Sequence, residues 1–314
     1  MYDLVIIGAG PAGLSAGLYA GRARLKVLIL EKGGVGGQIA ITDIIENYPG
    51  SMVDQKESGP TLIKRMRKQA EKFGAEIVKK EVKSVDFDSE IKKLTLENDE
   101  VIEAKSVIIA TGANPRKLNV PGELNFTGKG VSYCATCDAE LFTDLEVFVV
   151  GARNSAVEEA IYLSDFARKV TLLVRREKLR CDEIVKERME EKDNIFVKYH
   201  TSIKEIQGSM MLDKLVFVNN ETKEEWEYEA DEDDGLMGVF VFIGTIPNSK
   251  LFEGQIEMTE NGYILTDSKM RTNKENVYAV GDVRDTPLRQ VVTAVSDGAI
   301  AAVACEKKIK GLDY

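Results

Sequence analysis

One strand–turn–helix–strand pattern occurs twice in the chain, and this repeat constrains the fold more than any other feature. In the first copy, an apolar run at residues 4–7 leads into a glycine-rich turn at 8–13, a helix expected over 12–23 and a second apolar strand over 27–30. Residues 148–156 repeat the pattern of residues 5–13 at an offset of 143 residues. Each copy is a βαβ unit, so the repeat predicts two domains of dinucleotide-binding type.

The first turn has the sequence G-x-G-x-x-G, and each glycine has an expected task. Gly8 makes the tight turn, Gly10 leaves room for a pyrophosphate against the backbone, and Gly13 lets the helix pack closely on the strand. The free N–H groups at the start of the helix then stabilise the phosphates. Glu31 ends the second strand and can accept hydrogen bonds from a ribose. This agreement favours a nucleotide site over a glycine-rich turn without a ligand.

The second turn departs from this pattern at two important positions. Arg153 stands where the first copy has Gly10, and Val174 stands where it has Glu31. Three further arginines follow, which could bind a 2′-phosphate as an NADP site does, or could form a solvated basic face on a degenerate site. They are Arg175, Arg176 and Arg180. Arg153 could itself bind phosphate. We expect this unit to bind NADPH weakly.

Three further apolar segments set the expected domain boundaries. Residues 106–112, 238–244 and 277–283 each read as a buried strand that runs into a glycine-containing turn, and a last helix is expected from just after Gln290 to about Lys308. The sequence therefore predicts an α/β fold with two Rossmann-like three-layer domains, the second inserted in the first. The first domain is expected at residues 1–116 and 247–314, and the inserted domain at 117–246.

Composition limits the partners of this chain of 314 residues. The net charge is −10, which disfavours nucleic acids and anionic membrane surfaces. No apolar run reaches the roughly 20 residues of a membrane span, and the N-terminus lacks the features of a signal peptide. We expect a cytoplasmic protein, a compartment in which structural disulfides are rare.

Two of the four cysteines, Cys134 and Cys137, are separated by only two residues, and Asp138 follows them. Such a pair can bind a metal, form a structural disulfide or exchange electrons. A structural zinc site needs about four ligands, and the remaining cysteines and the one histidine have no ligand spacing, so no metal is expected. A redox pair therefore fits best. Cys181 and Cys305 are expected to be ordinary buried thiols, and His200 is expected to be structural.

Several motifs together resemble the low-molecular-weight thioredoxin reductases over nearly the whole chain. They are the first glycine turn and the segments 36–39, 46–50, 110–112, 134–138, 281–282 and 289–290. The resemblance implies FAD in the first domain, thioredoxin as partner, a homodimer, and an inserted domain that rotates. The expected cofactor-binding residues are Gly8, Gly10, Pro11, Ala12, Gly13, Glu31, Lys32, Gly37, Gln38, Asn47, Ala110, Thr111, Gly112, Gly281, Asp282, Arg289 and Gln290.

The resemblance also implies roles for the cysteine motif. Cys137 would lie nearest the flavin, Cys134 would attack the disulfide of the partner, and Asp138 would act as the acid and base. The alternative for Asp138 is a turn or helix cap, which aspartate commonly fills. Because the chain has a single histidine, far from every motif, Asp138 is the favoured proton carrier.

Arg153 and Val174 are also departures from the family members that use NADPH, which carry a glycine-rich loop and a histidine at these positions. At both, the chain resembles the ferredoxin-linked flavin thioredoxin reductases, so we expect ferredoxin rather than NADPH or NADH as electron donor. The acidic run at residues 229–234 would repel ferredoxin, so a docking patch is expected elsewhere. The alternatives are a conventional NADPH-dependent thioredoxin reductase, the flavoprotein of a peroxide-reducing system, and a flavin-bound redox sensor without turnover.

Overall fold

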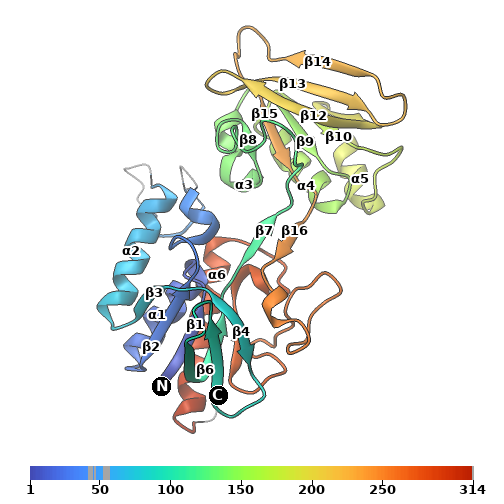
Figure 1. Cartoon of the computed structure of the whole chain (residues 1–314). Coiled ribbons are helices and arrows are strands. Elements are labelled where there is room, and N and C mark those ends of the chain that lie inside the picture. The colour runs from blue at the N-terminus through green and yellow to red at the C-terminus, as the bar shows by residue number, and fades with distance from the viewer. Residues whose placement is uncertain (42–44, 46, 52–56, 313–314) are drawn as a thin grey trace. The chain divides into compact units, whose positions relative to one another are not determined.

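The computed structural model describes residues 1–41, 45, 47–51 and 57–312 (Figure 1). The chain divides into two compact units, one formed by Met1–Asn114 with Ile246–Tyr314 and the other by Pro115–Thr245. It passes between the units within two short strands, β7 (Ala113–Pro115) and β16 (Thr245–Pro247). These boundaries lie slightly earlier in the chain than those expected from the sequence. Glu46, which belongs to one of the expected motifs, lies outside the described residues.

The first unit is built on a sheet with the described strand order β3-β2-β1-β6-β5-β4, and β17 also pairs with β6. Strands β1, β2, β3, β6 and β17 pair in parallel, whereas β4 and β5 extend the sheet in antiparallel pairing. The strands are β1 (Tyr2–Ile7), β2 (Val27–Glu31), β3 (Glu76–Lys79), β4 (Val82–Asp86), β5 (Lys92–Leu96), β6 (Val101–Ile109) and β17 (Val277–Ala279). The helices are α1 (Pro11–Arg22), α2 (Gly59–Lys72) and α6 (Val291–Ile309), with short 3₁₀ segments η1 (Gly37–Ile41), η3 (Lys250–Phe252) and η4 (Gly281–Val283).

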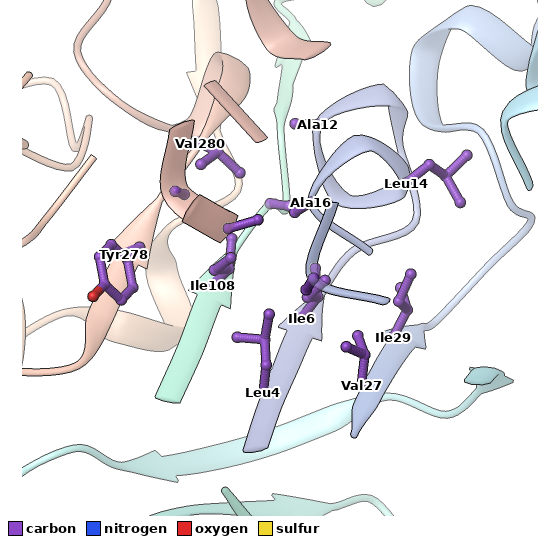
Figure 2. Packing of buried hydrophobic residues seen from close by; sticks show 14 of the residues in the cluster. Leu4, Ile6, Ala12, Leu14, Ala16, Val27, Ile29, Ile108, Tyr278 and Val280 are labelled. Carbon is purple, nitrogen blue, oxygen red and sulfur yellow. The ribbon is translucent and has the colours of Figure 1, made fainter. Parts of the chain in front are cut away.

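The apolar run of β1 forms a strand that is buried on both faces. Its side chains alternate, as in any strand: Leu4 and Ile6 belong to the core on the side of α1 and α6, while Val5 and Ile7 belong to the opposite core. Figure 2 shows Ile6 with Ile29 of the neighbouring strand and the small side chains of α1. The sheet thereby fixes the position at which the glycine turn leaves β1.

The second unit repeats this architecture with a parallel sheet of described order β11-β10-β9-β15-β8. Helices cover one face of the sheet, and an antiparallel sheet of order β12-β13-β14 covers the other. The strands are β8 (Val131–Ser132), β9 (Glu146–Val150), β10 (Lys169–Leu173), β11 (Ile195–Lys198), β12 (Thr201–Gly208), β13 (Leu212–Asn219), β14 (Glu225–Glu229) and β15 (Gly238–Val241). The helical segments are α3 (Ala135–Asp138), η2 (Ala139–Phe142), α4 (Asn154–Ser164) and α5 (Glu183–Glu190).

The predicted fold class is confirmed, because in each unit helices pack on one face of a largely parallel sheet and a second core lies on its other face. Three strands end earlier than expected: β6 at Ile109, β15 at Val241 and β17 at Ala279. Each is followed within a few residues by a glycine with a positive φ angle, a conformation that an extended strand cannot hold. In the described part of the chain, no helix is long and apolar enough to cross a bilayer.

Candidate functional site

The glycine turn of the first unit has the geometry of a phosphate-binding loop. A side chain at Gly13 would bring its Cβ to 2.0 Å from the carbonyl oxygen of Gly8, so only glycine lets α1 approach the turn. Gly8 itself has φ +110°, and its Cβ would lie 2.3 Å from the carbonyl oxygen of Ala110. By contrast, within the described part of the chain no heavy atom beyond the adjoining residues lies within 4 Å of a Cβ built on Gly10. The backbone at Gly10 therefore faces open space, where a phosphate can contact it.

The N-terminus of α1 is free to bind an anion. Gly10 is the N-cap residue, Pro11 opens the helix, and among the described residues no side-chain hydrogen bond caps the first turn. The first-turn N–H groups, which have no partner within a helix, and the helix dipole favour a negative group at this position. Pro11, Ala12 and Gly13 thus lie at the helix start, as expected.

Glu31 connects the end of β2 to the glycine turn. Its Oε2 accepts a hydrogen bond from the backbone N–H of Ala9 at 2.8 Å, and its Oε1 accepts one from Gly33 at 2.8 Å. A carboxylate has about four acceptor sites, so two remain for a ribose. The neighbouring Lys32 is mostly exposed, with Nζ 3.9 Å from a carboxylate oxygen of Glu81.

Amide side chains join several expected cofactor-binding segments. Gln38 donates from Nε2 to Oδ1 of Asn114 at 2.6 Å, and Asn114 donates to Oδ1 of Asn248 at 3.0 Å. The hydroxyl of Thr111 donates to the carbonyl of Asn248 at 2.8 Å. Asn114 and Asn248 were not among the residues expected from the sequence, where they read only as parts of loops. Gln38, Thr111 and the ends of both connecting strands therefore form one network.

A second amide contact joins Asn47 and Gln290, both expected from the sequence to bind the cofactor. Asn47 donates from Nδ2 to Oε1 of Gln290 at 3.1 Å, although the two lie 243 residues apart in the chain. Gln290 is the N-cap residue of α6, and it forms a capping box with Thr293. The start of α6 is thereby held against the segment that contains Asn47.

Asp282 lies in η4, where the turn after β17 carries it. Burial raises the pKa of this carboxyl to about 6, an effect that nearby Arg289 opposes and nearby Asp297 reinforces. Asp297 stabilises the turn, because its Oδ2 accepts a hydrogen bond from the backbone N–H of Gly281 at 3.0 Å. Arg284 in turn contacts both oxygens of Asp297, at 2.7 and 3.1 Å. Asp282 was expected from its motif, whereas no sequence pattern indicates the Arg284–Asp297 pair.

These residues fit a bound dinucleotide. The space over Gly10 can accept a pyrophosphate, and Asp282 is a largely buried carboxyl that a hydroxyl-bearing ligand would satisfy. The Nε atom of Arg289 is buried without a hydrogen-bond partner in the described part of the chain, while its guanidinium lies 4.2 Å from the ring centre of Tyr263. A buried donor without a partner is costly, so a polar ligand group is expected beside it.

In the second unit, Cys134 and Cys137 form a disulfide, and their Cα atoms are 5.3 Å apart. Both cysteines are half-buried. Cys134 is the N-cap residue of the single-turn helix α3, which contains Cys137 and Asp138. Among the described residues, no group of three or more histidine, cysteine, aspartate or glutamate side chains could hold a metal. The cysteine pair expected from the sequence is therefore present as a disulfide.

The carboxylate of Asp138 is held directly beside this disulfide segment. The hydroxyl of Ser132 donates to Oδ2 of Asp138 at 2.5 Å and accepts from the backbone N–H of Cys134 at 3.1 Å. Ser132 is buried at the end of β8. One side chain therefore fixes both the first cysteine and the expected proton carrier, a role that the sequence analysis did not assign.

A buried carboxylate supports the residue before Cys134. Glu123 accepts hydrogen bonds at 2.8 Å from the backbone N–H groups of Leu118 and Asn119 and from the hydroxyl of Tyr133. Burial, together with this bond, raises the pKa of Tyr133 well above its usual value. Glu123 is 1% exposed, so these three donors supply hydrogen bonds that water cannot give to its buried oxygens.

The second glycine turn differs from the first in its residues and contacts. Arg153 is the N-cap residue of α4, and its backbone pairs with Arg180 in an isolated parallel bridge. The backbone N–H of Arg180 donates to the carbonyl of Ala152 at 2.7 Å. Val174, the counterpart of Glu31, is fully buried. The segment after β10 is therefore fastened to the turn that would receive a pyrophosphate.

The remaining cysteines and the histidine lie away from the disulfide in the sequence. Cys305 is buried, and burial raises its pKa to about 12. Cys181 is only half-buried, which corrects the expectation of a buried thiol; it lies in the loop just before α5 rather than in a regular element. Burial raises its pKa as well, which disfavours the reactive thiolate. His200 occupies a turn with φ +51°, with Nδ1 3.6 Å from Oε2 of Glu221.

The chain is similar to known proteins over almost its whole length. The family model for pyridine nucleotide-disulphide oxidoreductases matches residues 2–298. A thioredoxin reductase of Peptoclostridium acidaminophilum is 51% identical over 99% of this chain and 98% of its own, and one of Bacillus subtilis is 42% identical over 99% and 96%. The crystal structure of thioredoxin reductase from Streptococcus pyogenes superposes with a TM-score of 0.91 at 42% identity, covering 99% of both chains.

Proposed function

Because this chain belongs to the low-molecular-weight thioredoxin reductases, within the pyridine nucleotide-disulphide oxidoreductase family, we propose that it reduces a thioredoxin disulfide through its own cysteine pair. One observation carries the proposal: the Cys134–Cys137 disulfide is accompanied by a carboxylate, Asp138, that Ser132 holds in place. A disulfide with only a structural task needs no such proton carrier.

We assign FAD to the first unit. Gly10 and the start of α1 would hold its pyrophosphate, Glu31 a ribose, and Asp282 and Gln290 the remainder of the molecule. The open space over Gly10 and the buried Nε of Arg289 support this assignment. When bound, FAD would supply a carrier that accepts electrons singly or in pairs and delivers them to a disulfide.

The thiol chemistry follows from the cysteine pair and Asp138. Two electrons and two protons convert the disulfide into two thiols, and Asp138 would move a proton at the departing sulfur. The Cys134 thiolate then attacks one sulfur of the thioredoxin disulfide and forms a mixed disulfide, while the other sulfur leaves and takes up a proton. Attack by Cys137 on Cys134 restores the internal disulfide and releases reduced thioredoxin.

We propose ferredoxin rather than NADPH as the electron donor, with two reduced ferredoxins oxidised for each disulfide opened. The residues of the second turn support this choice. Arg153 replaces the glycine that admits a pyrophosphate, Val174 offers no acceptor to a ribose, and Arg180 is bonded to Ala152 across the turn. A conventional NADPH-dependent enzyme remains the second candidate, since Arg175, Arg176 and Arg180 are the residue type that binds a 2′-phosphate.

The function is tested with Cys134→Ser. The variant should bind flavin and accept electrons from the donor, yet fail to reduce thioredoxin, measured as free thiols formed under argon. Normal thioredoxin reduction by the variant would refute the proposal. A flavin-bound sensor without turnover would instead show slow reduction of every disulfide partner with the wild-type chain as well.

The donor is tested by following flavin absorbance in the absence of oxygen. NADPH, NADH and reduced ferredoxin are mixed in turn with the wild-type protein. Rapid bleaching by ferredoxin alone is expected, whereas rapid bleaching by NADPH would establish the second candidate. A homodimer and a cytoplasmic location belong to the same proposal and are tested by sedimentation and by cell fractionation.

A further inference from the structure

Five basic residues lie in the second glycine turn and in the segment after β10 that is bonded to it, and we refer to them together as the basic loop surface. They are Arg153, Arg175, Arg176, Lys178 and Arg180. We propose that this surface docks the protein that donates electrons, an acidic iron–sulfur protein. The proposal rests on the proposed function, which takes a protein rather than a nucleotide as donor.

All five side chains are exposed, and none forms an ion pair within the part of the chain that the structure describes. Other arginines of the molecule are paired: Arg168 with Asp234, Arg271 with Asp267, and Arg284 with Asp297. Residues 175–180 include four positive side chains and one negative one, Glu177. In a chain of net charge −10, this is a local excess of unpaired positive charge.

The segment that carries these charges is fastened at its C-terminal end. Arg180 is bonded through its backbone to Ala152, as described above. Two residues later, Asp182 and Asn154 exchange hydrogen bonds: Nδ2 of Asn154 donates to Oδ2 of Asp182 at 2.7 Å, and the N–H of Asp182 donates to Oδ1 of Asn154 at 2.8 Å. The N–H of His200 donates to the carbonyl of Arg176 at 3.2 Å and holds the segment near its start. The backbone that presents the charges is therefore ordered before any partner arrives.

The position of the surface in the fold also favours a ligand. It lies beyond the carboxyl ends of β9 and β10, the edge at which parallel α/β sheets bind their ligands. With ferredoxin as the proposed donor this unit takes no dinucleotide, and these cations form no ion pair within the described residues. Charges at such an edge that serve neither folding nor a nucleotide remain available to a larger anionic partner.

Charge complementarity selects the occupant. An acidic protein can neutralise several of these side chains at once, and attraction between opposite patches raises association rates by a factor of about 10 to 1,000 at low ionic strength. The rest of the molecule is net negative and repels an acidic partner. Such a partner is therefore guided to the basic loop surface and away from acidic segments such as residues 229–234.

The experiment compares two triple variants with the same change in charge. The loop variant carries Arg175→Gln, Arg176→Gln and Arg180→Gln, and the control carries Lys129→Gln, Arg188→Gln and Lys250→Gln, which replace exposed cations elsewhere. Reduced clostridial-type ferredoxin is mixed with each protein without oxygen, and flavin bleaching is followed at low and high salt. Binding of oxidised ferredoxin is measured separately by calorimetry.

The loop variant should be reduced on the order of tenfold more slowly than wild type at low salt, with the difference shrinking at high salt. The control should stay within about twofold of wild type. A third variant, with lysine at the same three loop positions, should retain most of the rate because it keeps the charge. Calorimetric binding should weaken in the loop variant alone.

The outcomes distinguish the docking proposal from the proposal that ferredoxin is the electron donor. If ferredoxin reduces wild type and loop variant equally fast and binds both equally, the docking proposal is wrong while the donor stands. If ferredoxin neither binds nor reduces the wild type, both are wrong. If NADPH bleaches the wild-type flavin but not that of the loop variant, the surface is a nucleotide site, and the docking proposal fails.

Discussion

The hydroxyl of Ser132 lies 2.5 Å from Oδ2 of Asp138, six residues further along the chain. The Oγ atom of Ser132 also accepts a hydrogen bond from the backbone N–H of Cys134 at 3.1 Å. This one buried hydroxyl therefore sets the position of the expected proton carrier relative to the first cysteine of the disulfide. A serine two residues before a reactive cysteine reads as an ordinary strand residue until this contact is seen.

Ser132→Ala should slow thioredoxin reduction by about tenfold, because Asp138 loses the partner that orients it, whereas Asp138→Asn should cost on the order of a hundredfold. In the Asp138→Asn background, Ser132→Ala should add little, since both changes remove the same proton transfer. Steady-state rates of the wild type, the two single variants and the double variant make up this double-mutant cycle. Ser132→Thr, which keeps the hydroxyl, is the control and should retain most activity. Full additivity of the two changes would contradict the assignment.

Glu123 should stabilise the second unit more than an ordinary buried residue. Glu123→Leu leaves two backbone N–H groups and the hydroxyl of Tyr133 without an acceptor, at a cost of about 3 kcal/mol or more. Tyr133→Phe removes one donor only and should cost about 1 kcal/mol. Urea unfolding of the two variants measures both values. Equal effects would show that the backbone donors find other partners.

The layers of both units could be predicted from the sequence because they depend on local patterns. Apolar runs such as β1 have no alternative to burial, and a glycine such as Gly13 is required where a helix starts against a strand. The replacement of Gly10 by Arg153 was equally visible, since the repeat supplies its own reference. What a repeat cannot show is how neighbouring loops respond to the change.

The contacts that complete the site depend on the tertiary structure instead. The bond from Arg180 to Ala152 joins two turns that meet only when β9 and β10 pair. Glu123 and Tyr133 come together because the chain between them turns back toward β8. In the first unit, the Asn114–Asn248 contact joins the ends of the two connecting strands, 134 residues apart in the chain. No sequence spacing indicates such pairs.

The Arg284–Asp297 pair should hold the turn that carries Asp282. Both side chains are largely buried, so Asp297→Asn should destabilise the protein by roughly 3 kcal/mol and leave a buried guanidinium without a counter-charge. Replacing both residues at once, with Arg284→Met and Asp297→Leu, should cost less than the sum of the two single changes. A double-mutant cycle of urea unfolding measures the coupling energy between Arg284 and Asp297. Retention of flavin on gel filtration shows whether the turn that carries Asp282 is still in place. Additive single effects would mean that the pair does not act as a unit.

Asp282 should make the flavin-free protein less stable as the pH rises. Burial raises the pKa of this carboxyl to about 6, above the unfolded value of about 3.9, so the folded state holds the proton more tightly than the unfolded state between these values. The stabilisation that this proton gives is fully present below about pH 4 and is lost as the pH rises through about 6.

Asp282→Asn removes the titration, so at pH 8 the flavin-free variant should be about 1–3 kcal/mol more stable than wild type, while at pH 4 the two should differ little. Urea unfolding of both proteins at the two pH values measures this, and the variant should also bind FAD more weakly, because it lacks the carboxylate proposed to hold the cofactor. A difference in stability that is the same at pH 4 and pH 8 would show that Asp282 keeps an ordinary pKa in the folded chain.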